Sequence, residues 1–152
     1  MRDNRFVTTL SKAACENSAM PASIDNIVTV RRYLQGIEQG AFSVVKALFK
    51  RDALMEQLPN RIYPQGLLGT LSQMENAFEK GRTLFSAQTY EIKTAVAQEE
   101  RVAVEVVWTG TLVLGFGNLT AGTQMRCHSA MFFEFVDGKI ARQSNYDCFE
   151  EW

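Results

Sequence analysis

Apolar and polar residues alternate over long stretches in the last third of the chain. The alternation runs through residues 101–114 and 124–136, and it resumes over residues 140–149 after Asp137 and Gly138. A period of two is typical of a strand with one buried face, and an Asp-Gly pair is typical of a tight hairpin turn. We therefore expect long antiparallel strands here, the last of which ends close to a carboxylate.

The first half of the chain has a different pattern, in which apolar residues recur at the three- and four-residue steps of amphipathic helices. The elements predicted before the long strands are, in chain order, helices over residues 25–37 and 41–49 joined at Gly40, a short strand over residues 53–58, an irregular loop around Pro64 and Gly66, a helix from Thr70 or Ser72 to Gly81, and a strand over residues 86–98. Helices followed by antiparallel strands indicate an α+β fold.

Composition narrows the class of protein. The chain has 152 residues, of which 46% are hydrophobic and 22% charged, and its net charge is -1. These values predict a single globular domain over residues 23–152 behind a loosely ordered leader over residues 1–22, with no membrane span and no nucleic-acid partner. The cysteines are odd in number and widely spaced, which favours reduced thiols and a cytoplasmic location.

Several short strings resemble the nuclear transport factor two-like superfamily, in its SnoaL-like and ketosteroid-isomerase-like branch. The matching strings are Arg32-Tyr33, Gln39-Gly40, Ala47-Leu48-Phe49, Asp52-Ala53, Asp137-Gly138-Lys139-Ile140 and Tyr146-Asp147. The resemblance covers about residues 24–152. It implies a cone in which three N-terminal helices pack into a strongly curved antiparallel or mixed sheet, with a pocket inside.

Ketosteroid isomerases, which the chain resembles, use a tyrosine of the first helix to stabilise an enolate and a carboxylate to move the proton. Tyr33 matches that tyrosine. The position of the base falls at or next to Gln57, which cannot take a proton at neutral pH, and the second oxyanion donor falls near Met131. The resemblance therefore does not favour isomerisation by that mechanism.

The resemblance to limonene-epoxide-hydrolase-like proteins implies two acids bridged by an arginine. Asp147 matches the aspartate of the last strand, and Arg101 resembles the bridging arginine. The partner acid is missing, and Glu105 is the nearest substitute. Met55 and Gln57 replace the tyrosine and asparagine that hold the water in that family. SnoaL-like cyclases need a single carboxylate that removes a proton next to a carbonyl, and Asp147 is sufficient for that role.

Strand alternation places Gln143, Asn145 and Asp147 on one face of the last strand, and Arg101 and Glu105 on one face of an earlier strand. If both faces are concave, Arg101 meets Asp147 beside an apolar cavity. Two interpretations stay open at this point, because the pair is either part of an acid-base site or a structural ion pair at the edge of the sheet.

The leading hypothesis is a pocket that binds a small, mainly apolar, oxygenated or polycyclic molecule without a metal or a cofactor. Asp147 would be the general base, Arg101 would orient it, and Tyr33 and Gln57 would bind a substrate oxygen. Further ligand contacts are expected from Met55, Glu105, Met131 and Asn145. The alternatives are a binding or dimeric interaction module without catalysis, and an epoxide-hydrolase-like enzyme. A homodimer through the uncovered sheet face is expected, and His128 is predicted to lie on that outer face.

Overall fold

The computed structural model describes residues 22–152, so the leader predicted for residues 1–22 lies outside the described part except for Ala22. Within the described part, none of the helices combines the length and the hydropathy that a membrane span requires. The elements in chain order are α1 (Ala22–Glu38), α2 (Phe42–Leu48), β1 (Phe49–Gln57), β2 (Leu67–Thr70), α3 (Leu71–Leu84), β3 (Phe85–Gln98), β4 (Arg101–Leu112), β5 (Gln124–Val136) and β6 (Lys139–Phe149).

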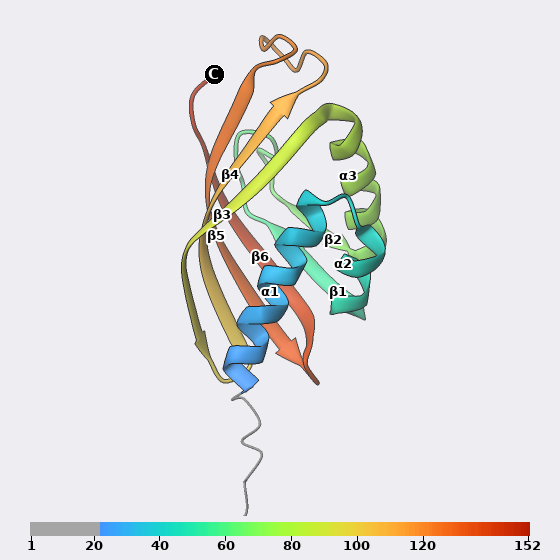
Figure 1. Ribbon diagram of the computed structural model, residues 1–152, viewed down its shortest axis with the longest axis vertical. Coiled ribbons are helices and arrows are strands. Elements are labelled where there is room, and N and C mark those ends of the chain that lie inside the picture. The colour runs from blue at the N-terminus through green and yellow to red at the C-terminus, as the bar shows by residue number, and fades with distance from the viewer. Residues whose placement is uncertain (1–21) are drawn as a thin grey trace, which may run out of the picture.

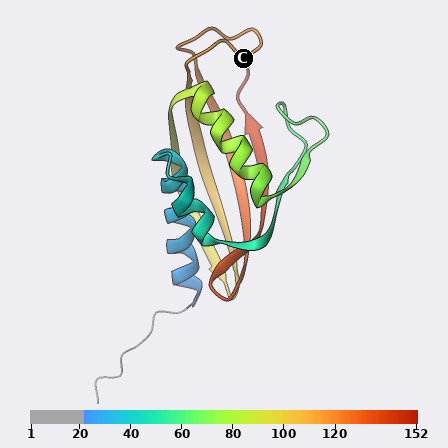
Figure 2. The same ribbon diagram turned by 90° about the vertical axis from the view of Figure 1, so that its right-hand side faces the viewer.

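The strands form one mixed sheet in the order β2-β1-β6-β5-β4-β3. β1 and β6 are parallel, and the other neighbouring strands are antiparallel. The sheet curves strongly, and α1 and α3 lie on its concave side (Figures 1 and 2). The predicted α+β class, with three helices packed into a curved sheet, is confirmed.

Three elements differ from the sequence-based expectations: β1, which begins at Phe49 rather than at residue 53, β2 and α3. β2 lies in the stretch that was expected to be an irregular loop, where Gly66 adopts a positive φ of 68° and allows the chain to turn back. Leu67–Thr70 then pairs antiparallel with β1. α3 continues past Gly81 to Leu84. The additional turn brings Leu84 against the cluster around Trp108, and this packing offsets the roughly 1 kcal/mol that a glycine costs inside a helix.

The apolar core lies between the helices and the concave face of the sheet. Val102, Val104 and Val106 of β4 are at most 3% exposed, and they pack with Phe133 of β5 and Leu34 of α1 in one cluster. A second cluster around Trp108, Leu112, Met125 and Cys127 lies further along the same strands. The concave side is therefore filled with apolar side chains at one end and becomes hollow toward the other.

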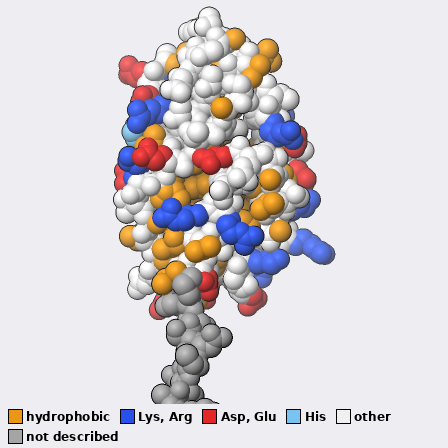
Figure 3. Space-filling view, in the orientation of Figure 1, with side chains coloured by type: hydrophobic (Ala, Val, Ile, Leu, Met, Phe, Trp, Pro, Cys, Tyr) orange, Lys and Arg blue, Asp and Glu red, His pale blue; other side chains and the backbone are white. Residues whose placement is uncertain are grey.

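The outer surface carries charges of both signs. On the face that bears α1, acidic and basic side chains are interspersed, and hydrophobic side chains gather over the lower half (Figure 3). The sheet also exposes apolar side chains on its convex face, among them Val96, Phe132 and Tyr146. This convex face is distinct from the concave face in both composition and packing.

Candidate functional site

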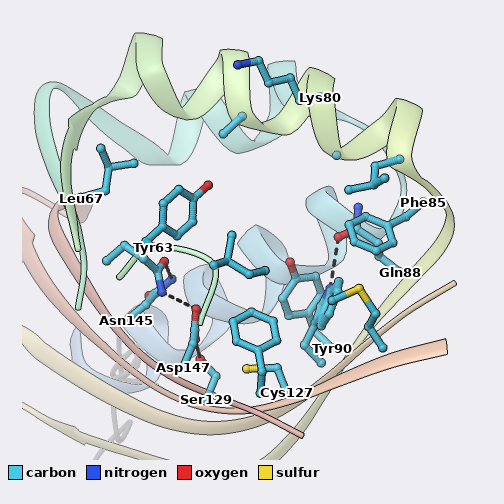
Figure 4. Close-up of a pocket in the computed structure, with 18 of the residues that line it drawn as sticks. Tyr63, Leu67, Lys80, Phe85, Gln88, Tyr90, Cys127, Ser129, Asn145 and Asp147 are labelled. Atoms are coloured by element: carbon cyan, nitrogen blue, oxygen red, sulfur yellow. Dashed lines mark hydrogen bonds between the residues drawn. The ribbon is translucent and has the colours of Figure 1, made fainter. Parts of the chain in front are cut away.

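A cavity of about 710 Å³ lies between α3 and the concave face of the sheet (Figure 4). Most of its lining is apolar. The apolar residues of the lining include Leu67, Leu84, Trp108, Met125, Met131 and Phe149. Pockets of this size accommodate small organic molecules, and a mainly apolar lining with a few polar groups is typical of ligand sites.

Asp147 of β6 lies on the floor of the cavity and is the acidic residue of its lining. Ser129 faces it directly across the β5–β6 pairing. One carboxylate oxygen accepts a hydrogen bond from Ser129 Oγ, and the other accepts one from Gln57 Nε2 of β1. Donors on two neighbouring strands thus fix the orientation of this carboxylate, and each of its oxygens can still accept a further hydrogen bond.

A row of three amide side chains, which we call the amide chain, connects Asp147 to the core. Gln57 Oε1 accepts from Asn145 Nδ2 at 3.4 Å, and Asn145 Oδ1 accepts from Gln143 Nε2 at 2.9 Å. Gln143 Nε2 also donates to the Tyr33 hydroxyl at 3.1 Å. Each amide therefore directs its NH₂ group either to the next member or, at the last step, to Asp147.

Gln143 is the most deeply buried member of the amide chain, with 1% of its surface exposed. Its Oε1 is buried and has no hydrogen-bond partner among the described residues. A buried amide oxygen without a hydrogen-bond partner lowers the free energy of unfolding by about 1–3 kcal/mol. The protein therefore keeps Gln143 at some expense of stability. Gln143 donates two hydrogen bonds, one to the Tyr33 hydroxyl in the core and one to Asn145 Oδ1 beside the cavity.

Burial governs the electrostatics around the cavity. It raises the pKa of Tyr33 to about 12, an effect that the Gln143 hydrogen bond partly opposes and the Asp147 charge reinforces. Burial, with Asp147 as the next cause, also raises the pKa of the Cys127 thiol to about 12. Burial likewise raises the pKa of Tyr90. At neutral pH these groups are uncharged, so the Cys127 thiol is a poor nucleophile and the two phenols are hydrogen-bonding groups.

Four of the predicted site residues, Gln57, Met131, Asn145 and Asp147, line this cavity together. Tyr33 lies outside the lining, in the core, where its ring packs edge-on against Phe49 and Phe133. Met55 lines a smaller adjoining cavity of about 110 Å³.

The structure does not bring Arg101 or Glu105 to Asp147. Arg101 is paired with Glu134 on the convex face at 3.9 Å, and its side chain is 78% exposed. The prediction that Arg101 meets Asp147 was wrong because the alternate residues of β4, Val102 to Val106, occupy the concave face instead. Glu105 is exposed on the same convex face, opposite Ala130. His128 is on the outer face, as expected, and contacts Glu150 at 3.0 Å.

Several polar residues of the cavity were not among the predicted site residues, and Ser129 and Tyr90 are two of them. Ser129 could have been found from the register, since it lies opposite Asp147 once β5 and β6 are paired. Tyr90 could not, because β3 contains an irregularity between Ile92 and Thr94 that changes which residues face inward. Tyr90 and Ile92, which precede the irregularity, face the concave side, whereas Val96, which follows it, is exposed.

This geometry can be compared with that of known proteins. The SnoaL-like domain family matches residues 30–143, which is most of the chain. The chain belongs to the SnoaL-like family. The matched region contains β1 to β5 and the amide-chain residues Gln57 and Gln143, and it ends within β6, before Asn145 and Asp147.

Solved structures share the fold at low sequence identity. The candidate hydroxylase AclR from Streptomyces galilaeus is 19% identical, with a TM-score of 0.70 over 83% of this chain and 76% of that one. The candidate polyketide cyclase IdmH from Streptomyces antibioticus is 16% identical, with a TM-score of 0.71 over 80% and 91%. An LEH-like epoxide hydrolase from M. tuberculosis is 15% identical, with a TM-score of 0.67 over 86% of each chain. No curated protein sequence matches this chain.

Proposed function

We propose that this SnoaL-like protein binds a small, mainly apolar, oxygenated molecule in the large cavity and that Asp147 removes a proton from a carbon next to its carbonyl group. The observation that carries the proposal is the position of Asp147, a carboxylate oriented by Ser129 and Gln57 on the floor of an otherwise mainly apolar cavity. A positioned base of this kind contributes roughly 10²- to 10⁴-fold to a proton transfer.

Proton abstraction would lead to isomerisation or to ring closure, depending on where the resulting carbanion reacts. Solved relatives of the same fold are named as a candidate polyketide cyclase and as an epoxide hydrolase. Epoxide opening by two acids is less favoured here, since Asp147 is the acidic residue of the described lining and Glu105 is on the convex face. In this proposal Gln57 and Ser129 take over the orienting role first expected of Arg101.

The proposal is tested by thermal unfolding of the wild type and of Asp147→Asn in the presence of carbonyl, polycyclic, terpenoid and epoxide compounds. A ligand that binds the folded state raises the melting temperature. Asp137→Asn is the matched control, because Asp137 lies in the β5–β6 turn with a φ of 52° that asparagine also tolerates. We expect some carbonyl compounds to raise the melting temperature of the wild type. The size of this rise should change in Asp147→Asn and stay the same in Asp137→Asn. Equal effects in all three proteins would contradict the proposal.

A second function, assembly, is favoured by the convex face of the sheet. Val96, Phe132 and Tyr146 are 59%, 50% and 50% exposed there, and the rings of Phe132 and Tyr146 contact each other with centroids 5.7 Å apart. We propose that a second copy of the chain covers this face in a homodimer, which would remove the apolar patch from water.

Sedimentation tests the dimer directly. The wild type is expected to be a dimer at micromolar concentration, and Phe132→Glu a monomer. Leu114→Glu is the control, because Leu114 is 61% exposed but lies in the loop beyond β4. A monomeric wild type would contradict the assembly proposal.

A cytoplasmic location is part of the same proposal. It is supported by Cys127 and Cys148, which are both free thiols in the described part of the chain.

A further inference from the structure

Tyr90 is a tyrosine of the cavity lining that stands on the sheet itself, across the hollow from Asp147 (Figure 4). It belongs to the edge strand β3, whereas Asp147 belongs to β6, and β4 and β5 lie between them. Because the sheet curves around the hollow, residues on these two strands face the same space from opposite sides. A bound molecule would therefore have the base on one side and the Tyr90 phenol on the other.

The Tyr90 hydroxyl is also uncommitted. The Tyr33 hydroxyl accepts from Gln143, and the indole of Trp108, directly opposite Tyr90 in the β3–β4 pairing, donates to Gln88 Oε1 at 3.1 Å. Among the described residues, the Tyr90 hydroxyl has no hydrogen-bond partner, and the hydrogen bond from Tyr90 to the Glu38 carboxylate is donated by the backbone N–H. A phenol in this situation has its proton available for a ligand.

Charge and burial keep that proton in place. Burial is the main cause of the raised pKa of Tyr90, and the nearby ionisable groups Tyr33, Asp147 and Glu38 act in the same direction. Tyr90 is thus a neutral donor throughout the ordinary pH range. A neutral donor held in a poorly solvated hollow is the type of group that stabilises negative charge developing on an oxygen.

We propose that the Tyr90 hydroxyl donates a hydrogen bond to the carbonyl oxygen of the substrate while Asp147 removes a proton from the neighbouring carbon. This inference rests on the proposed function. The C–H electron pair moves into the bond between the carbon and the carbonyl group, the C=O bond becomes C–O⁻, and the proton moves to Asp147. Tyr90 keeps its own proton. Where the substrate has a C=C bond at the β,γ position, deprotonation gives a dienolate, and Asp147 returns its proton to the γ carbon as the double bond moves into conjugation. Otherwise Asp147 gives its proton to the alkoxide formed when the enolate carbon attacks a second carbonyl.

The surroundings of Tyr90 indicate the class of substrate. The Trp108 ring, beside Tyr90, contacts Phe85 and Phe149 edge-on with centroids 5.1 and 6.2 Å away. Gly110 allows the indole to lie close to the backbone, since a Cβ there would be 2.5 Å from Trp108 Cζ2. An aromatic wall next to the oxygen donor suits a flat, largely apolar carbonyl compound with an acidic C–H on the side facing Asp147.

Two other tyrosines are weaker candidates for this donor. The hydroxyl of Tyr33 is occupied by Gln143 and lies outside the lining. Tyr63 lines the cavity but is 39% exposed, on the loop between β1 and β2, so water competes for its hydroxyl. Tyr90 is positioned by a strand, which favours it over a loop residue for a role that needs fixed geometry.

The test uses 2-naphthol, a flat aromatic alcohol whose ionised oxygen resembles an enolate oxygen, in the background of Asp147→Asn, which resembles the protonated base. Fluorescence titration would give the Kd of 2-naphthol, and the absorption spectrum of the bound dye would give its ionised fraction. We expect Tyr90→Phe to weaken binding by about 10- to 100-fold and to lower the ionised fraction, as for the loss of a hydrogen bond to a charged group. Tyr146→Phe, on the convex face, is the matched control.

The outcomes separate this inference from the proposed function. If 2-naphthol binds and responds to Asp147→Asn, but Tyr90→Phe binds it as tightly as its parent, the proposed function stands and the role of Tyr90 is overturned. If Tyr63→Phe or Tyr33→Phe weakens the binding of 2-naphthol and Tyr90→Phe does not, the hydrogen-bond donor is Tyr63 or Tyr33. That result would also overturn the role of Tyr90. If no variant binds 2-naphthol, both the role of Tyr90 and the proposed function are contradicted. Melting temperatures of the variants show whether a loss comes from unfolding.

Discussion

The concave and convex faces of the sheet are made by the same strands, yet they contain different chemistry. On the concave face, apolar side chains surround one carboxylate that is joined to a buried tyrosine by three amides. On the convex face, ion pairs such as Arg142–Glu56 at 2.8 Å and Arg126–Glu150 at 3.4 Å lie beside exposed apolar residues. Adjacent residues of one strand thus serve either a ligand site or an outer surface, and parity decides which.

The largest difference between the faces is expected at two neighbouring phenylalanines of β5. Phe133 is 1% exposed on the concave side and Phe132 is 50% exposed on the convex side. Phe133→Ala should lower the free energy of unfolding by about 3–5 kcal/mol, because it leaves a cavity in the core. Phe132→Ala should lower it by less than about 1 kcal/mol at protein concentrations low enough for the chain to be monomeric, where no second copy covers this ring. Urea denaturation at one protein concentration measures both, and similar losses would show that the faces are not distinct.

The pH dependence of stability should report the buried tyrosine of the concave side. Folding raises the pKa of Tyr33 from 10.0 to about 12, so its contribution to stability is full below about pH 10 and is lost as the pH rises toward about 12. The two-unit difference corresponds to about 2–3 kcal/mol.

Denaturation at about pH 9 and about pH 11 tests this contribution, since the two values lie on either side of the ordinary tyrosine pKa. The wild type should lose more stability between them than Tyr33→Phe, which has no phenol to ionise. Tyr146→Phe removes a tyrosine from the convex face as a matched control. The expectation fails if Tyr33→Phe loses as much stability as the wild type.

The amide chain offers a smaller contrast on β6, between Gln143 and Ser144. Gln143→Leu should lower the free energy of unfolding by about 1–3 kcal/mol, because the Tyr33 hydroxyl and Asn145 Oδ1 lose their shared donor. Ser144→Ala removes only a partly buried hydrogen bond to Glu56 and should cost less than about 1 kcal/mol. Chemical denaturation measures the free energy of unfolding of both variants. If that of Gln143→Leu equals that of the wild type, the amide chain contributes little to stability.

The smallest effect is expected for Arg101. Arg101→Gln removes an exposed pair with Glu134 and should change the free energy of unfolding by no more than about 0.5 kcal/mol. Ligand-induced shifts in melting temperature should also be unchanged, since the side chain is on the convex face. A loss of ligand response in Arg101→Gln would mean that this arginine reaches the site, as was first expected from the sequence.

The sequence predicts the elements well where the pattern is local. The Asp137-Gly138 turn, the helices and the long strands follow from hydrophobic period and turn residues, and the fold agrees with them. Asp147 could be proposed because it ends an alternating strand. β2 was not predicted, because the glycine and proline residues around it are typical of a loop. Its strand conformation depends on pairing with β1, which the local pattern does not show.

The orientation of the faces was harder to predict. Alternation divides β4 into two sets but does not say which is concave, and Arg101 was assigned to the wrong one. The apolar set Val102, Val104 and Val106 was the better indication of the inner face. On β3, the irregularity between Ile92 and Thr94 changes the parity partway along the strand. Tyr90 therefore could not be placed in the cavity from alternation alone.

The most direct test of the role of the concave face is hydrogen exchange in a simple ketone. 1-Tetralone in D₂O would be incubated with the wild type, Asp147→Asn or Asp137→Asn, and deuterium uptake at the carbon next to its carbonyl would be followed by NMR. We predict that the wild type and Asp137→Asn catalyse exchange faster than the buffer does. In Asp147→Asn the exchange rate should fall by roughly 10²-fold or more, or to the rate in buffer alone. Equal exchange rates in the wild type and Asp147→Asn would contradict a carboxylate base on the floor of this cavity.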